Sequence, residues 1–397
     1  MIYTIPTLSA VDRRVLEEIA HLGERLKWYL HVPQRWYGPL RRTVMARSVQ
    51  GSVAIEGYHA SLDNVTSVIE EEEVGELAED TRAAITGYRD AMTFALAVSD
   101  DWPRIDLSVI RAMHFMIVRH NLNARPGNWR PGGIWVRGSA GNVVYTAPDR
   151  SELPALLSEL IEQLAVEETP AMIKAAMAHL NLVLIHPFRD GNGRVARALQ
   201  TFVLASAGIR EPVFSGIEEY LGHNTSRYYD ALAEAAAGEW SPQRTARPWI
   251  RFCLTAHFQQ ARTHLRRIEE TELLWGDCER MAASAGLPER VVGALCDAAR
   301  GKTLQRSLYR RITVLSTAQE PSEPGATRDL AALTRAGLLE PSGSGRRRTY
   351  RATPQLRKVW DAIGARRRNR LIEDPYVTFG QQRIPTLSVT DLPSDNG

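Results

Sequence analysis

One short segment of the sequence combines a base, a carboxylate and two arginines. His186 carries an imidazole that can accept a proton near neutral pH, and Asp190 offers a hard oxygen ligand for Mg²⁺. Arg194 and Arg197 lie one helical turn apart and present two planar cationic donors to the same ligand. These residue types at this spacing are suited to phosphoryl or nucleotidyl transfer.

Two predicted helices position this segment. An apolar run, Ala171 to Ile185, has helical spacing and is stopped at Pro187, and a second helical pattern begins at Gly193. The residues between them, His186 to Asn192, therefore form a connector. The first turn of the second helix presents unpaired N–H groups and a positive dipole end, and Gly191 adds no Cβ, so phosphate can approach closely.

The segment from His186 to Arg197 reads HPFRDGNGRVAR and resembles the signature of the Fic family, HxFx(D/E)GNGRxxR, at every defined position. The resemblance implies a mostly α fold, a Fic helical bundle with a β-hairpin flap. It also implies transfer of AMP from ATP, with Mg²⁺, to a hydroxyl side chain of a target protein. His186 is then the catalytic base and Asp190 the metal ligand. The nucleotide-binding residues implied are Asp190, Gly191, Asn192, Gly193, Arg194, Val195, Ala196, Arg197, Tyr228 and Tyr229.

The resemblance also implies where each phosphate lies. Backbone groups of residues 191–193 and the Asn192 side chain hold the α-phosphate, and Arg194 and Arg197 take the β- and γ-phosphates. Phe188 packs to fix the loop. We interpret His114 as a core or interface histidine rather than a catalyst.

A second motif lies upstream, at the end of a helix predicted from about Leu40 to Ile55. Ser52, Glu56 and Gly57 fit the pattern (S/T)xxxE(G/N), which resembles the inhibitory motif of the N-terminally inhibited Fic class. Gly57 is a natural helix stop. We expect the Glu56 carboxylate to form a bidentate pair with Arg197 and so to occupy the place of the γ-phosphate.

The helical pattern is interrupted by a segment rich in Gly, Pro and β-branched residues. It predicts a hairpin with strands near Ile134 to Val136 and Val143 to Tyr145. The hairpin resembles the Fic flap, whose edge holds the target as an added strand, although a purely structural hairpin stays open. The flap residues expected to bind the target are Ile134, Trp135, Val136, Arg137, Gly138 and Ser139.

The C-terminal part looks like a winged helix-turn-helix module. A helix from Ala326 to Gly337 is followed by two short strands around a basic, Gly-rich tip. Pro321, Pro324 and Gly325 indicate a long loop before the helix. DNA and protein are both open as partners of such a module. The residues expected to contact DNA are Arg328, Arg335, Arg346, Arg347 and Arg348.

Composition sets the wider limits. The chain has 397 residues, of which 44% are hydrophobic and 24% charged, with a formal net charge of +3, as expected for a globular protein with two or three domains. Its three cysteines are widely spaced and indicate neither a disulfide framework nor a zinc site. Because no apolar run approaches the ~20 residues needed to span a bilayer, we expect a cytoplasmic protein with no membrane partner.

We expect four regions along the chain. Residues 1–100 form an N-terminal helical region with the inhibitory helix, and residues 101–287 form the catalytic domain. Residues 288–365 form the winged helix-turn-helix domain, and residues 366–397 form a basic tail without regular structure. The sequence also allows a homodimer.

Three other functions remain open at this point. The first is the reverse reaction, hydrolytic removal of AMP from a modified target at the same site. The second is a DNA-binding regulator whose Fic domain senses nucleotide. The third, a metal hydrolase built on His179, His186 and Asp190, is disfavoured because His179 lies two helical turns before His186.

Overall fold

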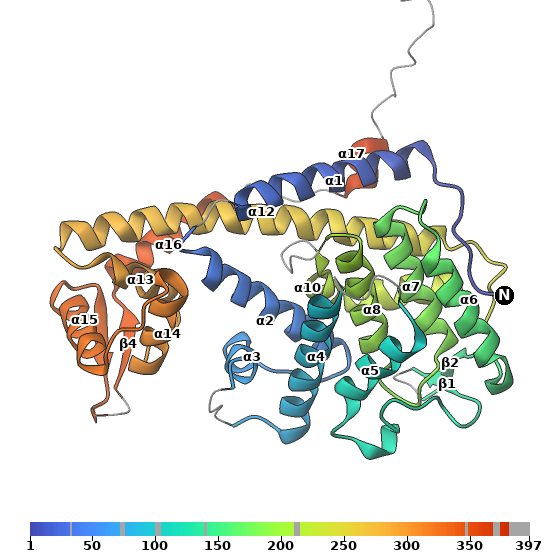
Figure 1. Cartoon of the computed structure of the whole chain (residues 1–397). Helices are drawn as coiled ribbons and strands as arrows, with labels where there is room; N and C mark the ends of the chain where they lie inside the picture. The colour runs from blue at the N-terminus through green and yellow to red at the C-terminus, as the bar shows by residue number, and fades with distance from the viewer. Residues whose placement is uncertain are drawn as a thin grey trace, which may run out of the picture.

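The computed structural model describes residues 1–31, 34–71, 76–99, 105–138, 141–209, 215–345, 348–367 and 374–380. The chain is mostly helical, as predicted, with two small antiparallel hairpins (Figure 1). None of the helices in these ranges has a stretch long and apolar enough to cross a membrane.

The helices between residues 10 and 236 form a bundle around α7 and α8. Nearly every side chain of α7 is buried, because apolar residues surround the helix on all sides. The bundle helices are α1 (Ala10–His31), α2 (Tyr37–Ile55), α3 (Leu62–Ile69), α4 (Glu79–Val98), α5 (Leu107–Val118), α6 (Leu153–Ala165), α7 (Ala171–Ile185), α8 (Asn192–Ser206), α10 (Glu218–His223) and α11 (Thr225–Ala236). Short 3₁₀ turns occur at Leu122–Ala124, Arg150–Glu152 and Glu289–Val291.

The predicted hairpin is confirmed. Strands β1 (Trp135–Arg137) and β2 (Val143–Thr146) pair antiparallel, with Trp135 opposite Thr146 and Val136 opposite Tyr145. A further backbone bridge joins Thr146 to Glu239, so the second edge of β2 is covered.

A single long helix, α12 (Arg247–Ser284), connects the bundle to the C-terminal part. Its 38 residues correspond to about 57 Å at 1.5 Å per residue. Helix α1 lies alongside it, and the bundle and the C-terminal elements gather near its opposite ends (Figure 1).

The C-terminal module comprises α13 (Val292–Ala299), α14 (Arg306–Thr317), α15 (Glu323–Arg335), β3 (Leu339–Ser342), β4 (Thr349–Ala352) and α16 (Pro354–Arg367). Strands β3 and β4 form a hairpin, and Leu304 pairs with Tyr350 of β4. The prediction of a long loop before the helix that became α15 is wrong. Pro324 and Gly325 lie in the first turn of α15, where proline is tolerated, and the Ser322 hydroxyl caps this helix by accepting the Gly325 N–H.

The expectation of a tail without regular structure is wrong for residues 375–380, which form α17 (Pro375–Gly380). Tyr376 and Phe379 lie three residues apart and therefore share a face. The Phe379 ring meets the Phe258 ring edge-on, and the Arg251 guanidinium lies 5.0 Å from the Tyr376 ring centre. These contacts attach α17 to α12 and α1. The polar composition of the tail did not predict this packing.

Candidate active site

His186 terminates α7 in the left-handed conformation, with φ 51° and ψ 55°. Its Nδ1 donates to the Val183 carbonyl at 3.0 Å, since a carbonyl only accepts, and this tautomer leaves Nε2 as the basic nitrogen. Burial lowers the pKa of His186 below its ordinary value, although the bond to Val183 opposes the shift. The imidazole is therefore neutral near pH 7 and can accept a proton.

The connector after His186 is held by Arg130, which the sequence did not single out. Its Nε donates to the His186 carbonyl at 2.9 Å, and its backbone N–H donates to the Pro187 carbonyl at 2.9 Å. The same guanidinium donates to the carbonyls of Gly132 and Pro148 on either side of the hairpin. Arg130 thus joins the hairpin to the connector that carries His186, and no local pattern reveals this role.

His114 supports the loop from α5. Its ring stacks on Phe188 with the centroids 3.7 Å apart. Its Nδ1 accepts the Gly127 N–H at 2.9 Å, so Nε2 carries the proton and donates to the Asp190 carbonyl at 3.1 Å. Burial lowers the pKa of His114 to about 4, which keeps this tautomer neutral. The interpretations of His114 as a core histidine and of Phe188 as loop packing agree with this geometry.

Asn192 holds the loop rather than facing a phosphate. Its Oδ1 accepts the Phe188 N–H at 2.9 Å, and its Nδ2 donates to the Phe188 carbonyl at 3.0 Å. The expectation that its side chain cradles the α-phosphate is therefore not supported. Val195 and Ala196 are also buried in the core, so only their backbone can serve a nucleotide.

The start of α8 has the features of an anion site. Gly191 precedes it with φ 80°, a conformation that favours glycine. Both arginines of the motif are 2% exposed, yet Nε and Nη1 of Arg194 and Nη1 of Arg197 have no hydrogen-bond partner among the described residues. Because buried donors without partners are costly, these three groups indicate a place for an anionic ligand.

Asp190 lies beside this site and is half exposed. Its Oδ1 accepts the Gly191 N–H at 2.6 Å and lies 3.6 Å from Arg194 Nη2. Both contacts use Oδ1, so Oδ2 can face solvent. A half-exposed carboxylate at the mouth of an anion site fits the role of a Mg²⁺ ligand, because Mg²⁺ is usually bound by one or two carboxylates together with substrate phosphates.

The end of α2 reaches the same arginine. Arg197 Nη2 donates to Glu56 Oε1 at 2.7 Å and to the Ser52 carbonyl at 3.1 Å, while Nε donates to the Ser52 hydroxyl at 2.8 Å. The pair with Glu56 is single and not bidentate: Ser52 accepts from Nε and shares Nη2 with Glu56, while Nη1 has no partner among the described residues. Gly57 has φ 87° and ends the helix directly after Glu56. A Cβ on Gly193 would lie 2.7 Å from Glu56 Oε1, so a larger residue at this position would require the carboxylate to shift.

The two tyrosines differ in position. Tyr228 is 1% exposed, and its hydroxyl bonds His179 Nε2 at 3.0 Å inside an aromatic cluster with Trp249. Its predicted contact with nucleotide is therefore not supported, because it belongs to the core. Tyr229 is 49% exposed, and its hydroxyl donates to the Ile55 carbonyl at 3.4 Å next to Glu56. Tyr229 stays a predicted nucleotide contact.

His179 is a structural histidine. It is fully buried, its Nδ1 bonds Gln200 Oε1 at 2.7 Å, and Tyr228 occupies Nε2. Both ring nitrogens are used within the bundle, so the structure does not support the metal hydrolase built on His179, His186 and Asp190.

The hairpin leaves several side chains exposed and one edge unpaired. Trp135, Val143 and Val144 are each about half exposed. The second edge of β2 is covered at Thr146, whereas the outer edge of β1 has no strand paired with it among the described residues. Of the predicted flap residues, Ser139 lies outside the described residues. Target binding by the other five stays a prediction.

The structure describes three of the five residues predicted to contact DNA. Arg328 and Arg335 are exposed on α15, and Arg348 is exposed before β4. Arg346 and Arg347 lie outside the described residues.

Comparison with known proteins identifies the domain. Residues 104–204 match the model of the Fic/DOC family. The chain is 28% identical over 256 residues to the protein adenylyltransferase fic-1 of Caenorhabditis briggsae, a match that covers 63% of this chain and 46% of that protein. It is 32% identical over 208 residues to the protein adenylyltransferase Fic of Culex quinquefasciatus, covering 51% and 38%. The chain thus spans less than half the length of these curated relatives.

The fold is shared with solved structures. A crystal structure of a Fic family protein from Desulfovibrio desulfuricans G20 superposes with a TM-score of 0.57 at 22% identity, covering 89% of this chain and 99% of that chain. Fic-1 of C. elegans superposes with a TM-score of 0.52 at 21% identity, covering 66% and 73%. The chain therefore contains a Fic domain with its helical fold, and it is homologous to protein adenylyltransferases.

Proposed function

We propose that the chain is a protein adenylyltransferase that transfers AMP from Mg²⁺-bound ATP to a hydroxyl of a target protein and is inhibited by Glu56. One observation carries the proposal. A neutral His186 and two buried arginines with unpaired donors meet at the start of α8, and Glu56 already binds Arg197. The names of the homologous proteins support the same reaction.

In this reaction, Nε2 of His186 takes the proton from the target hydroxyl as its oxygen attacks the α-phosphorus. The new O–P bond forms while the bond from the α-phosphorus to pyrophosphate breaks. Backbone N–H groups of residues 191–193 and the free donors of Arg194 and Arg197 stabilise the phosphate charges. Asp190 would hold Mg²⁺, which offsets charge on the leaving pyrophosphate when bound.

Inhibition follows from competition for Arg197. A γ-phosphate and the Glu56 carboxylate are both anions that require the same guanidinium, whose pKa is raised by the nearby Glu56 despite burial. With Glu56 in place, the triphosphate binds displaced, and the α-phosphorus does not align with the attacking oxygen.

The target would bind as a strand added to β1. The other edge of the hairpin is covered at Thr146, and Arg130 links the hairpin to the backbone of His186. An extended target segment along β1 would therefore present its hydroxyl near the imidazole.

The test is incubation of wild type, Glu56→Gly and His186→Ala with ATP labelled in the α-phosphate. We expect Glu56→Gly to label itself, or proteins in a lysate, more strongly than the wild type does. Labelling should be abolished when His186→Ala is combined with Glu56→Gly. Equal labelling of Glu56→Gly and wild type would refute the inhibition, and labelling that survives His186→Ala would refute the mechanism. Release of AMP from labelled protein by the wild type would instead support the reverse reaction.

A second function is favoured by the arginines of the C-terminal module. We propose that the module is a winged helix-turn-helix that binds DNA, with Arg328 and Arg335 of α15 in a groove and Arg348 on a phosphate. Binding of the full chain to duplex DNA should weaken steeply with salt, and the triple alanine variant should bind more weakly and with a shallower salt dependence. Salt-sensitive binding that is unchanged in this variant would exclude the proposed surface.

A further inference from the structure

We infer that Arg42 is a positioning residue for Glu56: its ion pairs with α3 and the C-terminal module hold helix α2 where its end can reach Arg197. This inference rests on the proposed inhibition by Glu56. It makes the C-terminal module part of the inhibitory apparatus.

Helix α2 spans the distance between the two sites. Its first turn lies against α14, since a Cβ on Gly38 would lie 2.9 Å from the Leu315 carbonyl oxygen. Its last residues carry Ser52 and lead into Glu56, about 21 Å from Arg42 along the helix axis at 1.5 Å per residue. Figure 1 shows α2 reaching from the C-terminal module into the bundle. A continuous helix transmits a displacement at one end to the other.

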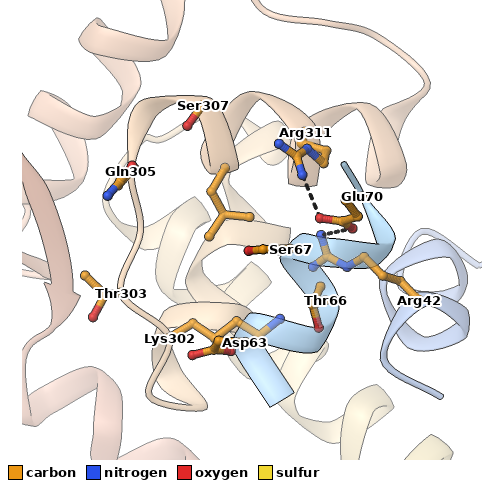
Figure 2. A pocket seen from close by; sticks show the side chains of 11 residues that line it. Arg42, Asp63, Thr66, Ser67, Glu70, Lys302, Thr303, Gln305, Ser307 and Arg311 are labelled. Atoms are coloured by element: carbon orange, nitrogen blue, oxygen red, sulfur yellow. Dashed lines mark hydrogen bonds and ion pairs between the residues drawn. The ribbon is translucent and has the colours of Figure 1, made fainter. Parts of the chain in front are cut away.

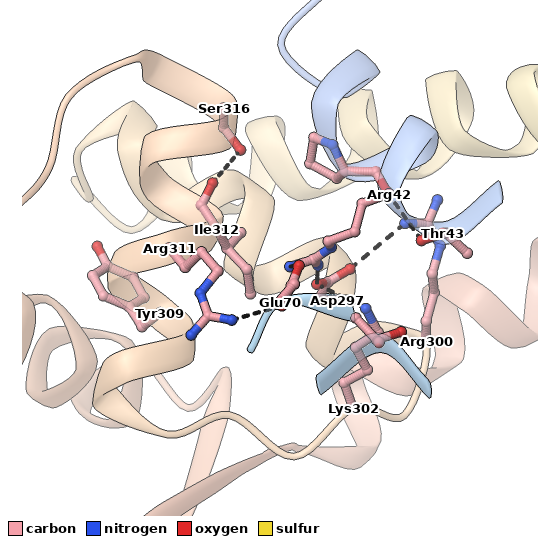
Figure 3. A network of polar contacts seen from close by, with 12 residues as sticks. Arg42, Thr43, Glu70, Asp297, Arg300, Lys302, Tyr309, Arg311, Ile312 and Ser316 are labelled. Carbon is pink, nitrogen blue, oxygen red and sulfur yellow. Dashed lines mark hydrogen bonds and ion pairs between the residues drawn. The ribbon is translucent and has the colours of Figure 1, made fainter. Parts of the chain in front are cut away.

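The ion pairs at the first end form a nearly buried network (Figure 3). Arg42 binds Asp297 of α13 through Nη2 and Glu70 through Nη1, both at 3.1 Å. Glu70 follows α3 and also accepts from Arg311 of α14 at 2.6 Å. The Arg42, Asp297 and Glu70 side chains are 8%, 5% and 14% exposed. Removing one partner therefore leaves a charge that water cannot fully solvate.

Asp297 stays ionised within this network. Burial alone would raise its pKa, but the charges of Lys302, Arg42 and Arg300 outweigh burial and hold the pKa of this carboxyl below its ordinary value. Lys302 Nζ lies 3.2 Å from Asp297 Oδ2, the oxygen that Arg42 also contacts. The module thus presents a fixed negative charge to α2.

The seam around the network is polar and partly open. A pocket of about 480 Å³ lies beside Glu70, between α3 and the segment leading into α14 (Figure 2). Its walls include Thr66, Ser67, Gln305 and Ser307. The ion pairs of Arg42 therefore act together with the packing of α2 against α14 to fix α2 relative to the module.

The middle of α2 crosses α10 and gives the helix a point about which to turn. Arg47 pairs with Glu219 at 3.3 Å, and a Cβ on Gly51 would lie 2.3 Å from the Glu218 carbonyl oxygen. With this crossing fixed, movement of the Arg42 end moves the Glu56 end.

The first test compares labelling by Arg42→Met, Arg42→Lys and Arg290→Met in the full chain. Arg290 forms a two-bond pair with Asp329, so its loss is a matched control for weakening an ion pair of the C-terminal part without removing a contact of Arg42, Asp297 or Glu70. We expect Arg42→Met to raise labelling by about threefold to tenfold, Arg42→Lys to restore part of the inhibition, and Arg290→Met to match wild type. In a Glu56→Gly background, Arg42→Met should add nothing.

The second test does not depend on activity. Hydrogen exchange of the backbone amides of residues 49–57 should rise in Arg42→Met and Asp297→Asn but not in Arg290→Met. Unchanged exchange in folded Arg42→Met would overturn the inference, as would equal stimulation with and without Glu56. If no variant labels at all, the proposed function fails, while the exchange result still decides whether Arg42 positions the end of α2.

Discussion

Gly51 of α2 and Gly222 of α10 cross in direct backbone contact: a Cβ added to Gly222 would lie 2.7 Å from the Gly51 Cα and 2.9 Å from its carbonyl oxygen. This crossing sets how far the end of α2 advances toward Arg197. No side chain larger than hydrogen fits at either position without moving a helix.

Gly51→Ala should therefore displace α2 and weaken the contact between Glu56 and Arg197. We expect labelling above that of the wild type but below that of Glu56→Gly, and a melting temperature lower by about 2–8 °C because overpacking costs about 1–3 kcal/mol. Gly364→Ala in α16 is the control, since an added Cβ there meets no atom within 4 Å. Wild-type labelling by a destabilised Gly51→Ala would contradict the prediction.

The pH dependence of labelling should reflect a histidine that stays neutral. Burial lowers the pKa of His186 below 6.5, and the base must be unprotonated, so activity is lost only as the pH falls through this lowered value. Single-turnover labelling by Glu56→Gly between about pH 5 and pH 8 should be level at the alkaline end. The pH of half-maximal activity should lie below 6.5, and a value at or above 6.5 would argue against His186 as the base.

His114→Phe separates stacking from hydrogen bonding at the catalytic loop. A phenyl ring can still stack on Phe188 but cannot accept from Gly127 or donate to the Asp190 carbonyl. Each lost bond costs about 1 kcal/mol, so we expect labelling by Glu56→Gly to fall by about tenfold or more. The exposed His21 of α1 gives the control substitution His21→Phe. Equal activity of the two variants would show that His114 does not support the loop.

Tyr228 and Tyr229 should respond differently to substitution in the Glu56→Gly background. Tyr228→Phe leaves the Nε2 of His179 without its partner and should lower stability by about 1–3 kcal/mol with little change in the KM for ATP. Tyr229→Ala should raise the KM for ATP, because this ring is half exposed beside Glu56. Denaturant unfolding and initial rates measure the two effects, and a raised KM in Tyr228→Phe would reverse the assignment.

The sequence by itself determined the type of chemistry and the ends of α7. Ala171–Ile185 has the predicted bounds because its apolar spacing and its stop signal are local. The positions of Glu56 and Gly57 at a helix end were also readable, since glycine alone favours a φ of 87° there.

Only the tertiary structure decided which side chains meet. Arg130, His114 and Arg42 act through partners that are 56, 76 and 255 residues away in sequence, and no local pattern specifies such contacts. The inward turn of Tyr228 and the outward turn of Tyr229 likewise depend on how α11 packs against α12. Periodicity is a property of neighbouring residues, whereas burial and pairing are fixed only when distant helices come together. The chemistry could therefore be predicted from the sequence, but the residues that position the reacting groups could not.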